Sequence, residues 1–163
     1  MPKSAVVSFA VLLLASALPV AAGPGQDHHE HHNATEKFSA GEPGDPTTPS
    51  RVIKVTMQER DGKMLFSPDH IEVRHGDQIK FVLYNSGELE HEFVLATAEE
   101  NLKHAEAMKI NPEMEHNDPN ARSVAPKNTD EIVWKFTNPG RFEYACLIPG
   151  HHEAGMFGTV DVK

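Results

Sequence analysis

Alternating apolar and polar side chains mark most of the chain after residue 50, and this period of two predicts short β-strands. In residues 51–59, Ile53, Val55 and Met57 fall on one face and their neighbours fall on the other. The same period, or a short apolar run that ends at turn residues, recurs in residues 70–77, 78–85, 91–97, 130–140, 141–148 and 156–163. The pattern therefore predicts about seven short strands between residue 51 and the end of the chain.

One stretch breaks this period and predicts a helix. Thr97, followed three residues later by Glu100, fits a capping box. Apolar residues then recur with helical spacing as far as Met108, and Asn111-Pro112 ends the run. We expect the polar residues 112–128 that follow to form a loop. Many short strands with a single helical insertion predict an all-β protein, a Greek-key β-sandwich with one short helix.

The first 50 residues lack this patterning. Residues 1–22 have the layout of a secretory signal peptide, with an early Lys3, an apolar run and the small residues Ala21-Ala22 at its end. A membrane anchor is the alternative, because the run is about long enough to span a bilayer. We expect cleavage after Ala22, export to the periplasm and no stable membrane insertion afterwards. Residues 23–50, rich in Gly, Pro, His and acids, predict a disordered tail before a single folded domain, residues 51–163.

The chain carries 24 acidic and 15 basic side chains, which gives a formal net charge of −9. A surplus of negative charge disfavours nucleic acids and anionic membrane surfaces as partners. It would suit a basic protein partner or simply keep the protein soluble, and solubility is the simpler interpretation. We expect a monomer.

The chain has one cysteine, Cys146, which cannot form an internal disulfide. It is followed by the turn Pro149-Gly150, by His151 and by Met156, in the spacing Cys-x₄-His-x₄-Met. Such a hairpin brings a thiolate, an imidazole and a thioether to one point. This soft donor set favours copper in a type 1 site, whereas zinc rarely uses methionine. Adjacent residues point apart, so we expect His152 to be exposed beside the copper, on a docking surface.

A type 1 site needs a second histidine, which must come from another strand. His91 is the best candidate, because it begins an apolar run after the turn Asn85-Ser86-Gly87 and can face the hairpin from a neighbouring strand. Its rivals His70 and His75 flank a short strand and are expected at exposed strand ends. A lone histidine on a strand is more often a surface or core residue than a ligand, so these residues alone leave the choice open.

Together these pieces resemble the cupredoxins, the blue-copper family that includes plastocyanin, azurin and auracyanin. The resemblance covers residues 52–163 and rests on a histidine after the FVLYN strand and turn, and on a C-terminal Cys-loop-His-loop-Met hairpin that ends in GMFGTVDV. It implies a β-sandwich that holds one type 1 copper. Carried over residue by residue, the imidazole ligands would be His91 and His151, the thiolate Cys146 and the axial ligand Met156.

Two features depart from better-known cupredoxins. The loop between Cys146 and His151 is longer than that of plastocyanin, and the loop between His151 and Met156 is one residue longer than that of azurin. Glu92 follows His91, where many cupredoxins have a small polar residue such as Asn that ties the loops together, which leaves the hydrogen bond to the cysteine sulfur open. With its His-rich leader, the chain is most similar to small periplasmic cupredoxins encoded with bacterial copper-tolerance systems.

Further donors lie outside this set. A histidine-rich run in the tail predicts an accessory site for extra copper, nickel or zinc, with a fortuitous polar tail as the alternative: His28, His29, His31 and His32. Met108, Met114 and His116, with His104 one helical turn before Met108, form a looser group. For that group, packing of Met108 in the core with the others at the surface is the simpler interpretation.

The main functional hypothesis is a periplasmic copper protein that acts in copper tolerance or homeostasis and in one-electron transfer, with a redox or copper-handling protein as partner. The His-rich tail favours it, because a pure electron carrier needs no such tail. The alternative is a dedicated carrier to a respiratory or photosynthetic partner with no role in tolerance. We expect no enzyme, because a thiol hydrolase built on Cys146 lacks an evident oxyanion loop. A multicopper reductase would need a second set of copper ligands, which one domain does not offer.

Overall fold

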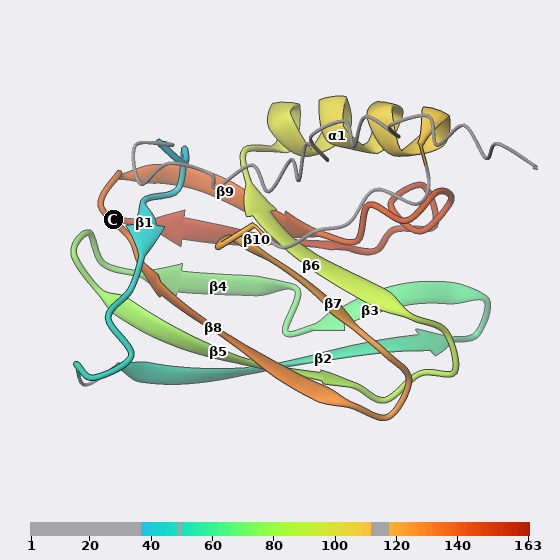
Figure 1. Cartoon of the computed structure of the whole chain (residues 1–163), viewed down its shortest axis with the longest axis horizontal. Coiled ribbons are helices and arrows are strands. Elements are labelled where there is room, and N and C mark those ends of the chain that lie inside the picture. Colours follow the sequence, from blue (N-terminus) through green and yellow to red (C-terminus); the bar gives the residue numbers. More distant parts are fainter. Residues whose placement is uncertain (1–36, 49, 112–117) are drawn as a thin grey trace, which may run out of the picture. The chain divides into compact units, whose positions relative to one another are not determined.

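Ten strands of the described chain form two β-sheets, which make the two layers of a sandwich (Figure 1). The computed structural model describes residues 37–48, 50–111 and 118–163. The first sheet contains, in order, β1 (Glu42–Pro43), β8 (Thr129–Lys135), β5 (Gln78–Asn85), β2 (Arg51–Arg60) and β3 (Lys63–Ser67). The second contains β4 (His70–Val73), β10 (Phe157–Val162), β9 (Gly140–Ala145), β6 (His91–Ala96) and β7 (Ala121–Val124).

Both sheets mix parallel and antiparallel pairs. β2 lies parallel to β5, with Ile53 opposite Phe81, and β4 lies parallel to β10, with Ile71 opposite Val160. The other strand pairs are antiparallel. Parallel neighbours cannot be joined by a tight hairpin, so the chain crosses to the other sheet between them. The predicted all-β sandwich with one helical insertion is confirmed.

The core lies between the facing sides of the two sheets. The alternation predicted for the first strand is confirmed, since Ile53, Val55 and Met57 are buried in it. Aromatic rings fill the centre, where Phe93 of β6 and Tyr144 of β9 stack with their centroids 5.3 Å apart. Cys146 and Met156 belong to the same buried cluster, so two of the candidate metal donors are part of the core.

The predicted helix is also confirmed. α1 (Ala98–Ile110) begins with a capping box, in which the Glu100 amide donates to Thr97 Oγ1 (3.2 Å) and the Thr97 amide donates to Glu100 Oε2 (2.9 Å). The helix contacts β6 and β9, and Met108 is buried there among apolar side chains of the second sheet. For Met108, core packing is therefore the correct interpretation. Met114 and His116 lie outside the described residues.

The predicted C-terminal limit of the disordered tail, residue 50, is wrong. Phe38 packs edge-on against Trp134, with ring centroids 5.4 Å apart, and Ala40 is fully buried. β1 then pairs with β8. The ordered domain therefore includes residues from 37 onward, because a few apolar side chains in an otherwise polar stretch pack against the first sheet. Residues 1–22, with the predicted signal peptide, and 28–32, with the histidine run, lie outside the described residues.

The expected loop at residues 112–128 contains a strand instead. β7 lies in its second half and pairs with β6, with Val124 opposite His91. Ala121 and Val124 are the buried residues of this strand, too short a pattern to show a period of two. The strand supplies the edge of the second sheet beside His91.

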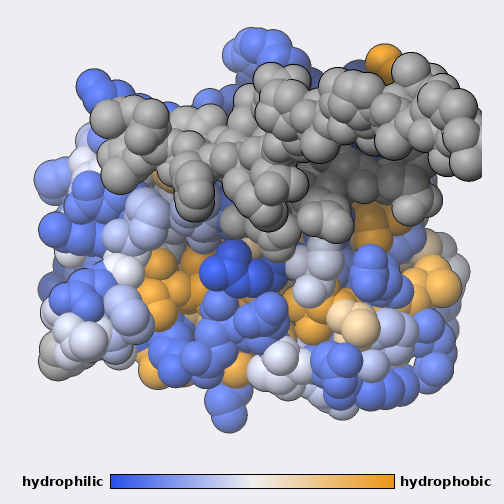
Figure 2. Space-filling model, viewed as in Figure 1, coloured by the Kyte–Doolittle hydropathy of each residue, from blue (hydrophilic) through white to orange (hydrophobic). Residues whose placement is uncertain are grey.

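Hydrophilic residues dominate the face seen in Figure 2, and hydrophobic ones show there in separate patches. The exposed large apolar side chains include Val52 on β2 and Ile110 at the end of α1. In the part of the chain that the structure describes, no helix has the length and apolar character needed to cross a membrane.

Candidate metal centre

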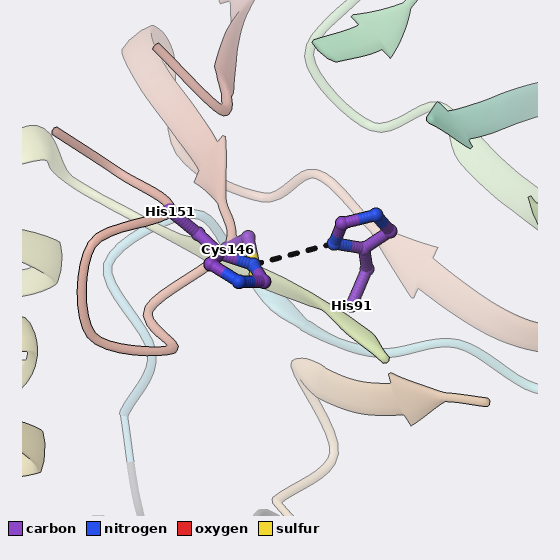
Figure 3. Close-up of side chains that lie close together, drawn as sticks. All are labelled: His91, Cys146 and His151. Carbon is purple, nitrogen blue, oxygen red and sulfur yellow. Dashed lines mark hydrogen bonds between the residues drawn. The ribbon is translucent and has the colours of Figure 1, made fainter. Parts of the chain in front are cut away.

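Three of the predicted ligands meet at one end of the sandwich (Figure 3). Nδ1 of His91 lies 3.3 Å from Nδ1 of His151, and Sγ of Cys146 lies 3.2 Å from the same His151 nitrogen. All three side chains are buried, with 0%, 8% and 0% exposure for His91, His151 and Cys146. The choice of His91 over its rivals is supported by this geometry. His70 and His75 lie at exposed positions, as expected.

The loop that carries Cys146 and His151 is closed by its own backbone. The amide of His151 donates to the carbonyl of Ile148 (2.9 Å), and Gly150 takes a left-handed φ of +91° that few other residues adopt. The amide of Cys146 donates to the carbonyl of Met156 (3.0 Å), and the amide of Met156 donates to the carbonyl of His151 (3.1 Å). Met156 is fully buried at the end of this loop. The loop therefore brings the backbones of Cys146, His151 and Met156 together by local geometry.

The Cys146 sulfur accepts a hydrogen bond from the backbone of Glu92, the residue after His91. The amide of Glu92 donates to Cys146 Sγ at 3.3 Å, so the bond left open by Glu92 is made by the main chain. Burial raises the pKa of the Cys146 thiol to about 12, although this amide and that of Ile148 favour the thiolate. A thiol of this kind loses its proton when a cation binds the sulfur, because the positive charge replaces the missing solvation.

The Glu92 side chain points to the neighbouring strand and loop. Its carboxylate accepts a hydrogen bond from the Ser123 hydroxyl (3.4 Å) on β7. Burial raises the pKa of this carboxyl to about 7, although the Leu147 amide and Ser123 stabilise the charged form. The region around the sulfur is therefore sheltered from water.

The two imidazoles are suited to hold a cation between them. Burial lowers the pKa of both His91 and His151, which favours the neutral rings that bind metals. On the far side of its ring, Nε2 of His91 lies 2.9 Å from Oε1 of Glu59. When Nε2 carries the ring proton, Nδ1 presents a lone pair to the centre. Two such lone pairs 3.3 Å apart repel each other unless a cation lies near both.

The donor set therefore fits copper. One thiolate and two imidazoles with a weak axial thioether make the type 1 copper site, and hard oxygen-seeking cations would avoid the sulfur ligands. The three clustered donors are buried and come from two segments of the chain.

Two residues outside the predicted ligand set support His91, and neither was predicted to do so. Asn85 is fully buried and donates to the carbonyls of Leu89 (2.7 Å) and Val124 (2.8 Å), while its Oδ1 accepts from the Gly87 amide (2.9 Å). It ties the loop before β6 to β7. Glu59 is the second such residue. An Asn at the end of a predicted strand is ordinary turn chemistry, so only the fold shows its role.

His152 is not part of the cluster, but the expectation that it is exposed is wrong. Its ring stacks on Phe157 with centroids 5.2 Å apart, and Nε2 lies 3.4 Å from Oε1 of Glu143. Glu143 is itself buried, because Asn101 of α1 covers it and donates to the same oxygen (3.1 Å). The His152 side chain, 16% exposed, is held by these groups and is not among the clustered donors.

Comparison with known proteins agrees with this geometry. Residues 53–163 match the family described as copper binding proteins, plastocyanin/azurin family. The chain is 42% identical over 167 residues to the copper-resistant cuproprotein CopI of Rubrivivax gelatinosus, with 99% of each chain covered. It is 32% identical to the CopI of Vibrio cholerae, with 83% of this chain and 79% of that protein covered.

Solved structures show the same fold. Dithionite-reduced auracyanin from the photosynthetic bacterium Roseiflexus castenholzii superposes with a TM-score of 0.58 at 20% identity. The match covers 71% of this chain and 99% of the auracyanin chain.

Proposed function

The chain belongs to the plastocyanin/azurin family of copper-binding proteins, and we propose that it is a periplasmic copper protein that acts in copper tolerance and transfers single electrons. The observation that carries the proposal is the buried meeting of Cys146 Sγ with the Nδ1 atoms of His91 and His151. Met156, buried at the end of the same loop, would supply the axial thioether. The role in tolerance follows from the end-to-end similarity to a protein named for copper resistance.

Bound copper supplies a one-electron redox couple. The residues of the chain fix the donor atoms and keep water out. The amide of Glu92 holds the sulfur, and the closed loop from Cys146 to Met156 keeps its donors in place whether or not the charge changes. Donors held in this way lower the cost of rearrangement on electron transfer. His151, 8% exposed, would offer the narrow edge by which electrons leave.

An enzymatic role is not part of the proposal. Cys146 is fully buried and its thiol pKa is raised to about 12, so it makes a poor nucleophile at neutral pH. The net charge of −9 supports a partner of basic character, either a redox protein or a copper-handling protein. The periplasmic location rests on the signal-peptide layout of the first residues.

The first experiment compares the mature protein with its Cys146→Ser variant after one equivalent of Cu(II). We expect an intense thiolate-to-copper absorption band and the EPR spectrum of a copper–thiolate centre in the wild type, both absent from the variant. A wild type without the band would contradict the proposed ligands. His75→Ala is the control for loss of a histidine, because this exposed residue lies outside the cluster.

A second experiment separates tolerance from simple electron carriage. A strain that lacks the protein should grow poorly in excess copper and recover with the wild-type gene but not with Cys146→Ser. Equal growth of all strains in excess copper would favour the dedicated electron carrier.

A further inference from the structure

We propose that Glu59 is a positioning residue of the copper centre, which holds His91 in the metal-binding tautomer and places a negative charge behind it. The inference rests on the proposed function, because it takes His91 as a copper ligand. It adds to that function a residue from the opposite sheet. Glu59 lies near the end of β2, whereas His91 begins β6.

The contact is short and sheltered. Oε1 of Glu59 lies 2.9 Å from Nε2 of His91, whose ring is fully buried. The N–H does not point straight at this oxygen, and within the described residues Nε2 has no aligned hydrogen-bond acceptor. Glu59 is thus the group that meets the far side of the ring. A buried N–H is costly without an acceptor, so the carboxylate favours the proton on Nε2 and leaves Nδ1 free.

Glu59 is itself fixed by the loop that precedes His91. Oε2 accepts from the amide of Glu88 and Oε1 from that of Leu89, both at 3.0 Å. Gly87 allows this approach, because a Cβ there would lie 2.3 Å from Oε2 of Glu59. The carboxylate is therefore gripped by backbone amides on one side and faces the imidazole on the other. Only 25% of the Glu59 side chain is exposed, so the side chain has little freedom to move.

This arrangement has two consequences for a metal on Nδ1. A carboxylate behind a ligating histidine orients the ring and increases its basicity, and loss of such a partner typically weakens metal binding about 10- to 100-fold. Its negative charge also stabilises Cu(II) more than Cu(I), because the attraction grows with the charge of the ion. Glu59 should therefore lower the reduction potential of the centre.

The test compares Glu59→Gln with Glu88→Gln. The first keeps the size of the side chain and removes the charge behind His91. The second removes an identical charge from the same region, at an exposed side chain that pairs with Lys127 (2.6 Å) and not with His91. We expect Glu59→Gln to weaken Cu(II) binding about 10-fold or more, by chelator competition, and to raise the reduction potential. Glu88→Gln should change both much less.

The copper-free protein provides an independent readout. The ¹⁵N shifts of the His91 ring should show a proton on Nε2 in the wild type and in Glu88→Gln, and a mixture of tautomers in Glu59→Ala. Equal effects of Glu59→Gln and Glu88→Gln on affinity and potential, with an unchanged His91 tautomer in Glu59→Ala, would overturn the proposal. A wild type that lacks the copper–thiolate band would overturn the proposed function instead, and the imidazole shifts would still decide whether Glu59 holds His91.

Discussion

The two sides of the metal centre are built in different ways. Cys146, His151 and Met156 come from one short loop, which its own backbone hydrogen bonds close. His91 stands alone on β6, and the groups around it come from β2, β5 and β7. Hydrogen bonds within one loop build most of the first side, while the second depends on contacts from both sheets.

This difference predicts how mutations should act. Changes around His91 should couple copper binding to the free energy of unfolding, because the same buried polar groups serve both. Changes in the ligand loop should alter the copper centre with a smaller loss of stability.

Asn85→Ala should have the largest effect on stability. The substitution removes two donated bonds and one accepted bond, and leaves the Leu89 carbonyl, the Val124 carbonyl and the Gly87 amide without their buried partner. The Val124 carbonyl and the Gly87 amide make buried bonds, and each costs about 1–3 kcal/mol when orphaned, so we expect a loss of roughly 2 kcal/mol or more in urea unfolding of the copper-free protein. Copper affinity should fall with it.

Asn138→Ala is the matched control for this substitution. Asn138 also donates a side-chain hydrogen bond, to the Ser39 carbonyl (2.8 Å), but at an exposed position. Its loss should cost about 0.5 kcal/mol or less, as is usual for surface substitutions. Similar losses for the two variants would mean that the buried Asn85 network does not hold the fold together.

Gly87→Ala should come next, with its effect directed at copper. A Cβ at residue 87 would force the Glu59 carboxylate away from its present place, because the two would lie 2.3 Å apart. We expect a fall of about 10-fold in Cu(II) affinity, as when a ligating histidine loses its partner. Gly62→Ala strains a left-handed turn (φ +74°) that is open to solvent, so it should lower stability and leave copper affinity unchanged.

The same contrast explains which parts of the site could be predicted from the sequence. The Cys-x₄-His-x₄-Met spacing is visible in a single line of residues, because those donors meet within one loop. His91 was selected mainly by family resemblance. Glu59 lies on a different sheet, and nothing in its neighbours along the chain indicates that it contacts a histidine more than 30 residues away.

For the fold, strong periodicity was sufficient and weak periodicity was not. The strand with Ile53, Val55 and Met57 and the helix capped by Thr97 were predicted, since each shows several repeats of its pattern. β1, β3 and β7 were missed, because none of them alternates regularly between buried and exposed side chains. Their places are set by pairing with the neighbouring strands β8, β2 and β6, which is a property of the assembled sheets.

Met156→Leu, in the ligand loop, should change the reduction potential more than the stability. Met156 is fully buried, and leucine has a similar volume, so the free energy of unfolding of the copper-free protein should change by less than about 1.5 kcal/mol. The weak axial ligand is lost and an apolar side chain takes its place, which favours the less charged Cu(I), so the reduction potential should rise. Cyclic voltammetry and urea unfolding measure the two effects. A large loss of stability with an unchanged potential would mean that Met156 serves the core and not the metal.

Glu100→Gln should have the smallest effect, because α1 lies outside both sides of the centre. Burial opposes the charge of Glu100, but hydrogen bonds from Ser39 and Thr97 outweigh it and hold the pKa of the carboxyl below its usual 4.5. A pKa that is lower in the folded than in the unfolded state stabilises the protein above the unfolded value, and this contribution disappears as the pH falls through the folded value. Wild type should therefore be slightly more stable than Glu100→Gln at pH 7, and the difference should shrink below pH 4.5. Urea unfolding of the copper-free proteins at pH 7 and at acidic pH measures this difference.

Glu106→Gln, on the exposed side of the same helix, is the control and should change stability less at pH 7. A copper spectrum that changed in Glu100→Gln would show that α1 contributes to the metal centre through Glu143 and His152. The helix would then be a third part of the centre, beside the loop and the surroundings of His91.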